Sequence, residues 1–153
     1  AIHIGNYFNV SLKHIKSAIE AYQPNNNRSE RIEWKGNIVL LDAYNANPSS
    51  MMAMIDYFEA YPTDEKILIL GSMAELGQET NNEHKQILDR LTSFASNQVI
   101  LIGESFKALA KSYNRYHFSN SNEVKAFLDS LRIKDHLILV KGSRKYALET
   151  IFI

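Results

Sequence analysis

The sequence predicts an α/β domain with a Rossmann-like, three-layer architecture and a mostly parallel sheet. Short runs that are apolar throughout alternate with helical patterns of about ten to fifteen residues. Such runs are typical of strands in a parallel sheet that helices cover on both faces. The first two strands are joined by a tight turn that contains glycine, so we expect a hairpin that adds an antiparallel edge.

Residues 1–27 differ in pattern from the rest of the chain. Leu12, Ile15, Ile19 and Tyr22 follow helical spacing, which predicts one amphipathic helix over 11–22 with Ser11 as its cap. The stretch 23–27, Gln-Pro-Asn-Asn-Asn, is a loop by composition. This helix either packs on the domain that follows or is the last helix of a preceding domain, and its pattern favours neither.

The domain itself begins with two strands, over 31–34 and 38–42, that turn through 35–37. A helix over 49–61 follows, because its apolar residues recur at i, i+3, i+4 and i+7. Its start is well marked, with Asn47 as a cap and Pro48 at the first helical position.

The later elements alternate regularly. A capping box of Thr80 and Glu83 should open the second helix of the domain, and Asn120 with Glu123 should open the fourth. His84 then lies near an exposed helix start, where we expect it to be solvated. The remaining elements are strands over 66–70, 99–102, 116–118 and 137–140, a helix over 104–113 and a final helix from about Arg144.

Composition excludes several classes of function. The formal net charge of the 153 residues is zero, so the chain carries no electrostatic footprint for nucleic acid or an anionic membrane. It has no cysteine, which excludes disulfides and thiolate sites and permits a reducing cytoplasm, where we expect the protein to act. No apolar run is long enough to span a membrane, and no signal peptide opens the chain. Because the first residue is Ala and not Met, we expect a fragment or a processed chain.

Three strand ends should meet at one rim of the sheet, where open α/β sheets bind ligands. They are Asp42–Asn47, Gly71–Gly77 and Lys141–Arg144. Each has a structural alternative. Asn47 is more readily explained as a helix cap. Asp42 is a loop carboxylate or holds a nearby turn in the structural alternative, Gly71 and Gly77 provide turn geometry, and the two cations are solvated charges. Cations beside helical N–H groups are better explained by an anion between them, so Lys141–Arg144 is equally a candidate carboxylate or phosphate site.

Familiar catalytic motifs are absent from the sequence. It contains no phosphate loop of the form G-x-x-x-x-G-K-[ST], no dinucleotide fingerprint G-x-G-x-x-G and no G-x-S-x-G elbow. The five histidines show no metal-ligand spacing, so we predict no metal site. The chain therefore does not contain a complete catalytic centre of these kinds.

Four segments resemble the Mur ligases, and most closely those that add D-alanyl-D-alanine to the peptidoglycan precursor. Residues 42–48 resemble the family segment D-[AS]-Y-N-A-N-P, residues 70–77 resemble L-G-D-M-x-E-L-G, and residues 140–144 resemble V-K-G-S-R. Arg28 corresponds to an Arg that opens the third domain of these enzymes. The four occur in the family's order and spacing and span nearly the whole chain from residue 28.

The resemblance implies a domain organisation and a reaction. Residues 1–27 would be the C-terminal stub of the central ATPase domain, and residues 28–153 the C-terminal domain, with the phosphate loop upstream. The full-length enzyme would use ATP and Mg²⁺, with most metal ligands upstream, to phosphorylate the carboxylate of UDP-MurNAc-tripeptide. The amine of D-Ala-D-Ala would then attack the acyl phosphate. The isolated fragment should be inactive.

The resemblance also assigns roles to rim residues. The expected ATP contacts, carried over from the family's motifs, are Arg28, Asp42, Tyr44, Asn45 and Asn47. Lys141, Ser143 and Arg144 would hold the D-Ala-D-Ala carboxylate or the reacting anions. The sequence departs from the family at Ser72, where Asp is usual, and over 145–147.

One alternative belongs to another class. A stand-alone, receiver-like signalling module would use Asp42 as its phosphoacceptor and Lys141 as the partner lysine. Against it, residues 38–48 supply Asp42 alone, whereas a receiver needs further acidic residues for magnesium.

Overall fold

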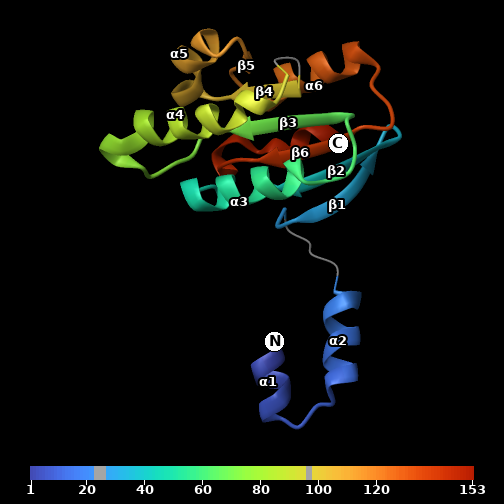
Figure 1. Cartoon of the computed structure of the whole chain (residues 1–153). Helices are drawn as coiled ribbons and strands as arrows, with labels where there is room; N and C mark the ends of the chain where they lie inside the picture. Colours follow the sequence, from blue (N-terminus) through green and yellow to red (C-terminus); the bar gives the residue numbers. More distant parts are fainter. Residues whose placement is uncertain (23–26, 96–97) are drawn as a thin grey trace.

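The computed structural model describes residues 1–22, 27–95 and 98–153, and contains one six-stranded sheet (Figure 1). Its strand order is β1-β2-β6-β3-β4-β5. Strands β1 and β2 pair antiparallel, and every other neighbouring pair is parallel. The mostly parallel sheet with an antiparallel edge is therefore confirmed. The strands are β1 Glu30–Trp34, β2 Asn37–Asp42, β3 Lys66–Gly71, β4 Val99–Ile102, β5 Tyr116–Phe118 and β6 Leu137–Lys141.

Helices cover both faces of the sheet, as the three-layer prediction requires. One apolar cluster joins the sheet to α3 (Pro48–Glu59), α4 (Thr80–Arg90) and α5 (Glu104–Ser112). The other joins the opposite face to α6 (Ser121–Leu131) and the 3₁₀ segment η5 (Leu148–Phe152). Alternate residues of β6 serve the two clusters, with Leu137 and Leu139 in the first and Ile138 and Val140 in the second. This alternation explains why the strand is apolar throughout.

Local signals placed several boundaries correctly. Asn47 caps α3, with its side chain accepting the Ser50 N–H, and Pro48 occupies the first turn. Asn120 caps α6 in the same way, by accepting the Glu123 N–H. The hairpin turn is also confirmed, with Lys35 and Gly36 both at positive φ. Two successive positive φ values are the signature of a type I′ turn, which matches the twist of the paired strands.

Two expected helix features are wrong. Thr80 does not cap α4, because its hydroxyl donates to the Gly77 carbonyl and a 3₁₀ turn, η1 (Gly77–Glu79), precedes the helix. The final helix is not α-helical. It consists of η4 (Arg144–Tyr146) and η5, which are separated by Ala147 at φ 44°. A left-handed residue interrupts the right-handed helical path, and nothing in the local sequence marks it. One further short 3₁₀ segment is η2 (Leu91–Ser93).

The N-terminal segment forms a helical hairpin of α1 (Ile2–Tyr7) and α2 (Leu12–Ala21). Helix α2 and its Ser11 cap confirm the prediction, whereas α1 was missed because it is short and has no side-chain cap. The expected loop over 23–27 lies largely outside the described residues. Ile15 is buried against Gly5, and neither apolar cluster of the sheet includes a residue of the hairpin.

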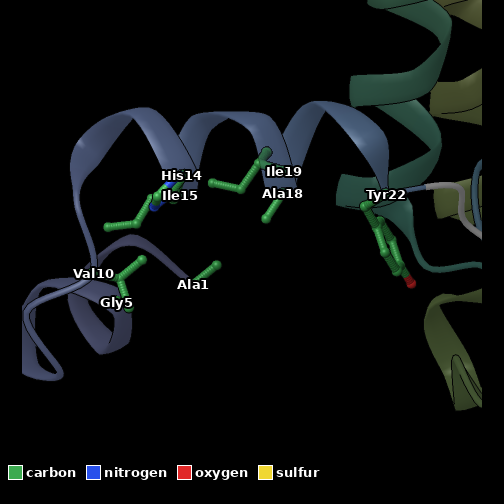
Figure 2. A pocket seen from close by; sticks show the side chains of 8 residues that line it. All are labelled: Ala1, Gly5, Val10, His14, Ile15, Ala18, Ile19 and Tyr22. Carbon is green, nitrogen blue, oxygen red and sulfur yellow. The ribbon is translucent and has the colours of Figure 1, made fainter.

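An apolar hollow of about 540 Å³ opens on this hairpin (Figure 2). Many apolar side chains of the hairpin are exposed, among them Tyr7, Phe8, Leu12 and Tyr22. Within the described part of the chain, no helix combines the length and the apolar character needed to cross a bilayer. The residues that line the hollow are Ala1, Gly5, Val10, His14, Ile15, Ala18, Ile19 and Tyr22.

Candidate functional site

The strand order brings the three predicted rim segments together. Strands β2, β6 and β3 are neighbours and run parallel, so their carboxyl ends share one edge of the sheet. Asp42 and Lys141 are register partners at the ends of β2 and β6, and Lys141 is also the partner of Leu70 in β3. The predicted rim therefore exists as one continuous structure.

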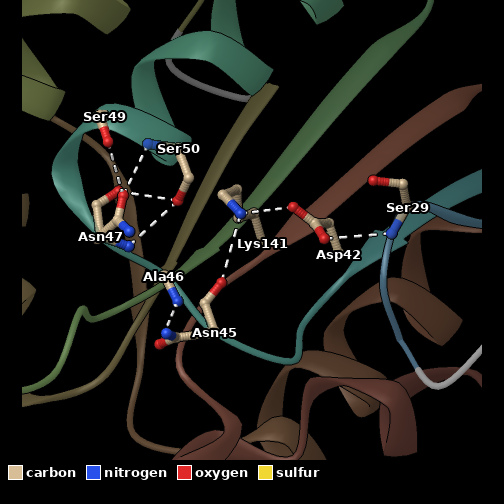
Figure 3. A network of polar contacts seen from close by, with 8 residues as sticks. All are labelled: Ser29, Asp42, Asn45, Ala46, Asn47, Ser49, Ser50 and Lys141. Atoms are coloured by element: carbon tan, nitrogen blue, oxygen red, sulfur yellow. Dashed lines mark hydrogen bonds and ion pairs between the residues drawn. The ribbon is translucent and has the colours of Figure 1, made fainter. Parts of the chain in front are cut away.

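Asp42, which is partly buried, and Lys141, which is buried, form an ion pair at the centre of this rim (Figure 3). Lys141 Nζ lies 2.5 Å from Asp42 Oδ2, and only 2% of the lysine side chain is exposed. The other carboxylate oxygen, Oδ1, accepts the Ser29 N–H at 3.2 Å. Lys141 is therefore not a solvated charge. Asp42 holds the backbone near Ser29, in agreement with the alternative in which this carboxylate holds a nearby turn.

The loop between β2 and α3 is held at several points. The Asn45 carbonyl accepts a longer hydrogen bond from Lys141 Nζ at 3.4 Å. Its side-chain Oδ1 accepts the Ala46 N–H at 2.8 Å, which leaves the amide nitrogen on an exposed residue. The Asn47 side chain is occupied by Ser50 N–H and the Ser49 hydroxyl at the start of α3. Asn45 therefore offers a polar edge to a ligand, whereas Asn47 Oδ1 is committed to the helix cap.

Tyr44 brings two predicted site arginines together. The Arg28 guanidinium lies 3.9 Å from the centre of the Tyr44 ring, and that of Arg144 lies 5.8 Å from it. All three residues are exposed. Two guanidiniums within cation–π range of one ring bring several donors close together, an arrangement suited to phosphate or carboxylate oxygens.

The loop after β6 is closely packed beneath Arg144. Ser143 is buried, and its hydroxyl accepts the Lys145 N–H at the start of η4. A Cβ on Gly142 would lie 2.7 Å from the Gly71 Cα, so glycine is required where β6 and β3 approach each other. Tyr146, which sequence reasoning did not single out, covers Gly103 so closely that a Cβ there would lie 2.4 Å from its ring.

The segment after β3 is held by His84, a residue of α4. His84 is fully buried, so the prediction of a solvated histidine is wrong. Its Nε2 accepts the Met73 N–H at 2.9 Å, which leaves Nδ1 to donate to the Thr80 carbonyl at 2.6 Å. Burial lowers the pKa of His84, and the Thr80 hydrogen bond and nearby Glu83 oppose that effect only in part. The neutral ring ties the predicted Gly71–Gly77 segment to α4.

Ser72, where the family usually has Asp, is also buried. Its hydroxyl donates to the Ile102 carbonyl at 3.1 Å, and the same residue's N–H donates to that carbonyl at 2.8 Å. The side chain therefore joins β3 to β4. Among the described residues, no group of three or more His, Cys, Asp or Glu side chains is placed to hold a metal ion.

A sequence profile described as the glutamate ligase domain of Mur ligases matches residues 27–144. The chain belongs to this family. The match covers the rim and all the motifs that suggested the resemblance. It also supports the ligase interpretation and not the receiver-like alternative.

Named relatives point to one branch of the family. Two are UDP-N-acetylmuramoyl-tripeptide–D-alanyl-D-alanine ligases, from Buchnera aphidicola and Rickettsia prowazekii. The Buchnera enzyme is 35% identical over 93% of this chain and 32% of its own length. The Rickettsia enzyme is 31% identical over 81% of this chain and 28% of its own length. The chain thus spans about a third of the length of the curated relatives that it matches.

Solved structures agree with this placement. A crystal structure of MurF from Acinetobacter baumannii superposes with a TM-score of 0.79 and 26% identity, covering 98% of this chain and 34% of that one. A MurF ligase from Thermotoga maritima in complex with ADP has a TM-score of 0.76 at 19% identity, which establishes a shared fold.

Proposed function

We propose that this chain is the C-terminal part of an ATP-dependent amide ligase that adds D-Ala-D-Ala to UDP-MurNAc-tripeptide. The observation that carries the proposal is the meeting of the three motif segments at one rim, in a chain whose named relatives are ligases of this kind. The reaction transfers the γ-phosphoryl group of ATP to the tripeptide carboxylate and releases ADP. The dipeptide amine then attacks the acyl carbonyl, an amide forms and phosphate leaves.

ATP would lie against the segment after β2. We assign its contacts to Arg28, Asp42, Tyr44, Asn45 and Asn47. The described geometry fits best at Arg28 and Asn45, whose guanidinium and amide are exposed. Asp42 could still accept a ribose hydroxyl, because a carboxylate has about four acceptor positions and the described residues use two of them. Asn47 would contribute through its amide nitrogen, since its oxygen caps α3.

The dipeptide would lie against the loop after β6, where we assign Lys141, Ser143 and Arg144. Arg144 is the exposed member, and a guanidinium suits bidentate binding of a carboxylate. Lys141 and Ser143 are buried and would act from beneath by fixing the path of the loop. Most ligands of Mg²⁺ would lie upstream in the full-length enzyme, as the family's domain organisation implies.

The N-terminal hairpin would be the end of the central ATPase domain, with residues 28–153 as the C-terminal domain. Its exposed apolar side chains and the hollow in Figure 2 support this division, because such a surface favours burial against further protein. Domain closure would then bring the rim over a nucleotide bound upstream and keep water from the acyl phosphate. We place the enzyme in the cytoplasm, where nucleotide-linked precursors are made.

The test is phosphate release by the full-length parent with ATP, magnesium and UDP-MurNAc-tripeptide, with and without D-Ala-D-Ala. We expect release to require the dipeptide and to yield a product heavier by one D-Ala-D-Ala unit. Single amino acids in place of the dipeptide serve as the control. Release that depends on another amine, or on none, would overturn the assignment.

A further inference from the structure

Lys141 occupies a position that the sheet would normally fill with an apolar residue. It continues the row of Leu137 and Leu139 on the face that α3 and α4 cover, and its side chain is 2% exposed. Burying an ammonium is costly unless the charge is paired and hydrogen-bonded. The lysine therefore needs both of the acceptors that the structure gives it.

Both acceptors belong to residues 42–45, where β2 ends and the connection to α3 begins. Lys141 Nζ donates to Asp42 Oδ2, at the end of β2, and to the Asn45 carbonyl three residues later (Figure 3). A single buried ammonium thus fixes where the segment starts and how it turns. Asn47 fixes the far end by capping α3.

The residues that Lys141 holds are in turn bonded to residues 27–29, which precede β1. Asp42 Oδ1 accepts the Ser29 N–H, and the Tyr44 N–H donates to the Asn27 carbonyl at 3.1 Å. These bonds hold Arg28 within 3.9 Å of the Tyr44 ring. The position of Arg28 therefore depends on the segment that Lys141 holds.

We propose that Lys141 is a positioning residue for the nucleotide side of the site: its buried ammonium sets the path of residues 42–45 and, through Asp42 and Tyr44, the place of Arg28. This deepens the proposed function and rests on it. Lys141 belongs by sequence to the loop assigned to the dipeptide, but its charge is directed toward β2. The exposed Arg144 remains the cation that can meet the dipeptide.

The kinetic test compares Lys141→Met with Lys145→Met in the full-length parent. Methionine keeps most of the lysine stem and removes the charge. Lys145 is an exposed lysine that follows Lys141 in the same loop and lies outside the ion pair. We expect Lys141→Met to raise the KM for ATP about tenfold or more and that for D-Ala-D-Ala less than threefold. Lys145→Met should change neither. A rise confined to the dipeptide KM, or equal rises for both substrates, would overturn the proposal.

A second measurement does not depend on ligase activity. In the NMR spectrum of the present chain, the Lys141 ammonium should give a signal protected from solvent exchange, and Asp42→Asn should abolish that protection. Amide exchange at Tyr44 should then accelerate at least tenfold. An ammonium that exchanges as fast as that of Lys145 would refute the positioning role, even if the parent proved to be an active ligase. If Lys141→Met failed to fold, the exchange measurement on the Lys141 ammonium of the wild-type chain would decide the proposal by itself.

Discussion

Replacement of His84 by leucine should destabilise the domain although the side-chain volume changes little. The substitution removes the hydrogen bonds from Met73 N–H and to the Thr80 carbonyl. Met73 is itself 4% exposed, so its N–H would be left buried without its partner. Two lost hydrogen bonds at about 1 kcal/mol each, with up to about 2 kcal/mol more for the orphaned donor, give a loss of about 2–4 kcal/mol. The edge-on contact with Phe106 adds a smaller amount.

Urea unfolding at pH 7.5 measures this loss, with His84→Gln as the control because a glutamine amide can restore one of the two bonds. We expect the leucine variant to unfold at a clearly lower urea midpoint with an unchanged slope, and the glutamine variant to lie between it and the wild type. A leucine variant within about 0.5 kcal/mol of the wild type, the range of ordinary surface substitutions, would refute the reasoning.

The same histidine predicts a pH dependence with a definite sign. Burial holds the pKa of His84 below its ordinary value of 6.5, so the unfolded chain binds the proton more readily than the folded one. The stability that the neutral ring contributes is complete above about pH 6.5 and is lost as the pH falls toward the lower folded-state pKa. The wild type should therefore lose more stability between pH 7.5 and 5.5 than His84→Gln. An identical loss in both proteins would contradict this assignment.

Substitutions at three further positions separate structural from functional roles. Asn45→Ala should raise the KM for ATP of the full-length parent about three- to tenfold at unchanged thermal stability, because its side chain is exposed and its hydrogen bond within the described residues is a local one, from the neighbouring Ala46 N–H; a stability loss without a kinetic change would contradict it. Asn47→Ala should lower the free energy of unfolding by about 1 kcal/mol through loss of the α3 cap, and Asn47→Asp, which keeps the cap, should not. Gly142→Ala should cost about 1–3 kcal/mol in urea unfolding, because the new Cβ would lie 2.7 Å from the Gly71 Cα; an unaffected midpoint would show that the two strands can separate.

Local signals predicted much of this fold. The strands were found because burial on both faces makes each an apolar run, and α3 because Asn47 and Pro48 mark its first turn. The end of the chain was predicted less well. The left-handed conformation of Ala147, which divides η4 from η5, has no signal in an alanine. Tertiary packing determines this backbone conformation, and the residue types next to Ala147 do not indicate it.

The candidate site was also predicted only in part, because burial depends on residues that are distant in the sequence. The meeting of the three strand ends at one rim was predicted, because parallel strands place their carboxyl ends at the same edge of a sheet. The pairing of Asp42 with Lys141 also requires β2 and β6 to be neighbours, which the sequence does not state. The burial of Lys141 was not predicted either, because the sequence does not state whether a charge at a strand end faces solvent or a helix. His84 was misjudged for the same reason: an apolar partner from α5, Phe106, encloses it from a distant part of the chain.

Hydrogen–deuterium exchange of the full-length parent would test most directly whether this rim forms part of the nucleotide site. The measurement compares peptides that cover 42–47 and 141–146 with and without a non-hydrolysable ATP analogue, magnesium and UDP-MurNAc-tripeptide. Our account predicts slower exchange in both segments when the ligands are present, and no change at the opposite edge of the sheet around the 35–37 turn. Protection that is confined to the upstream domains would contradict it.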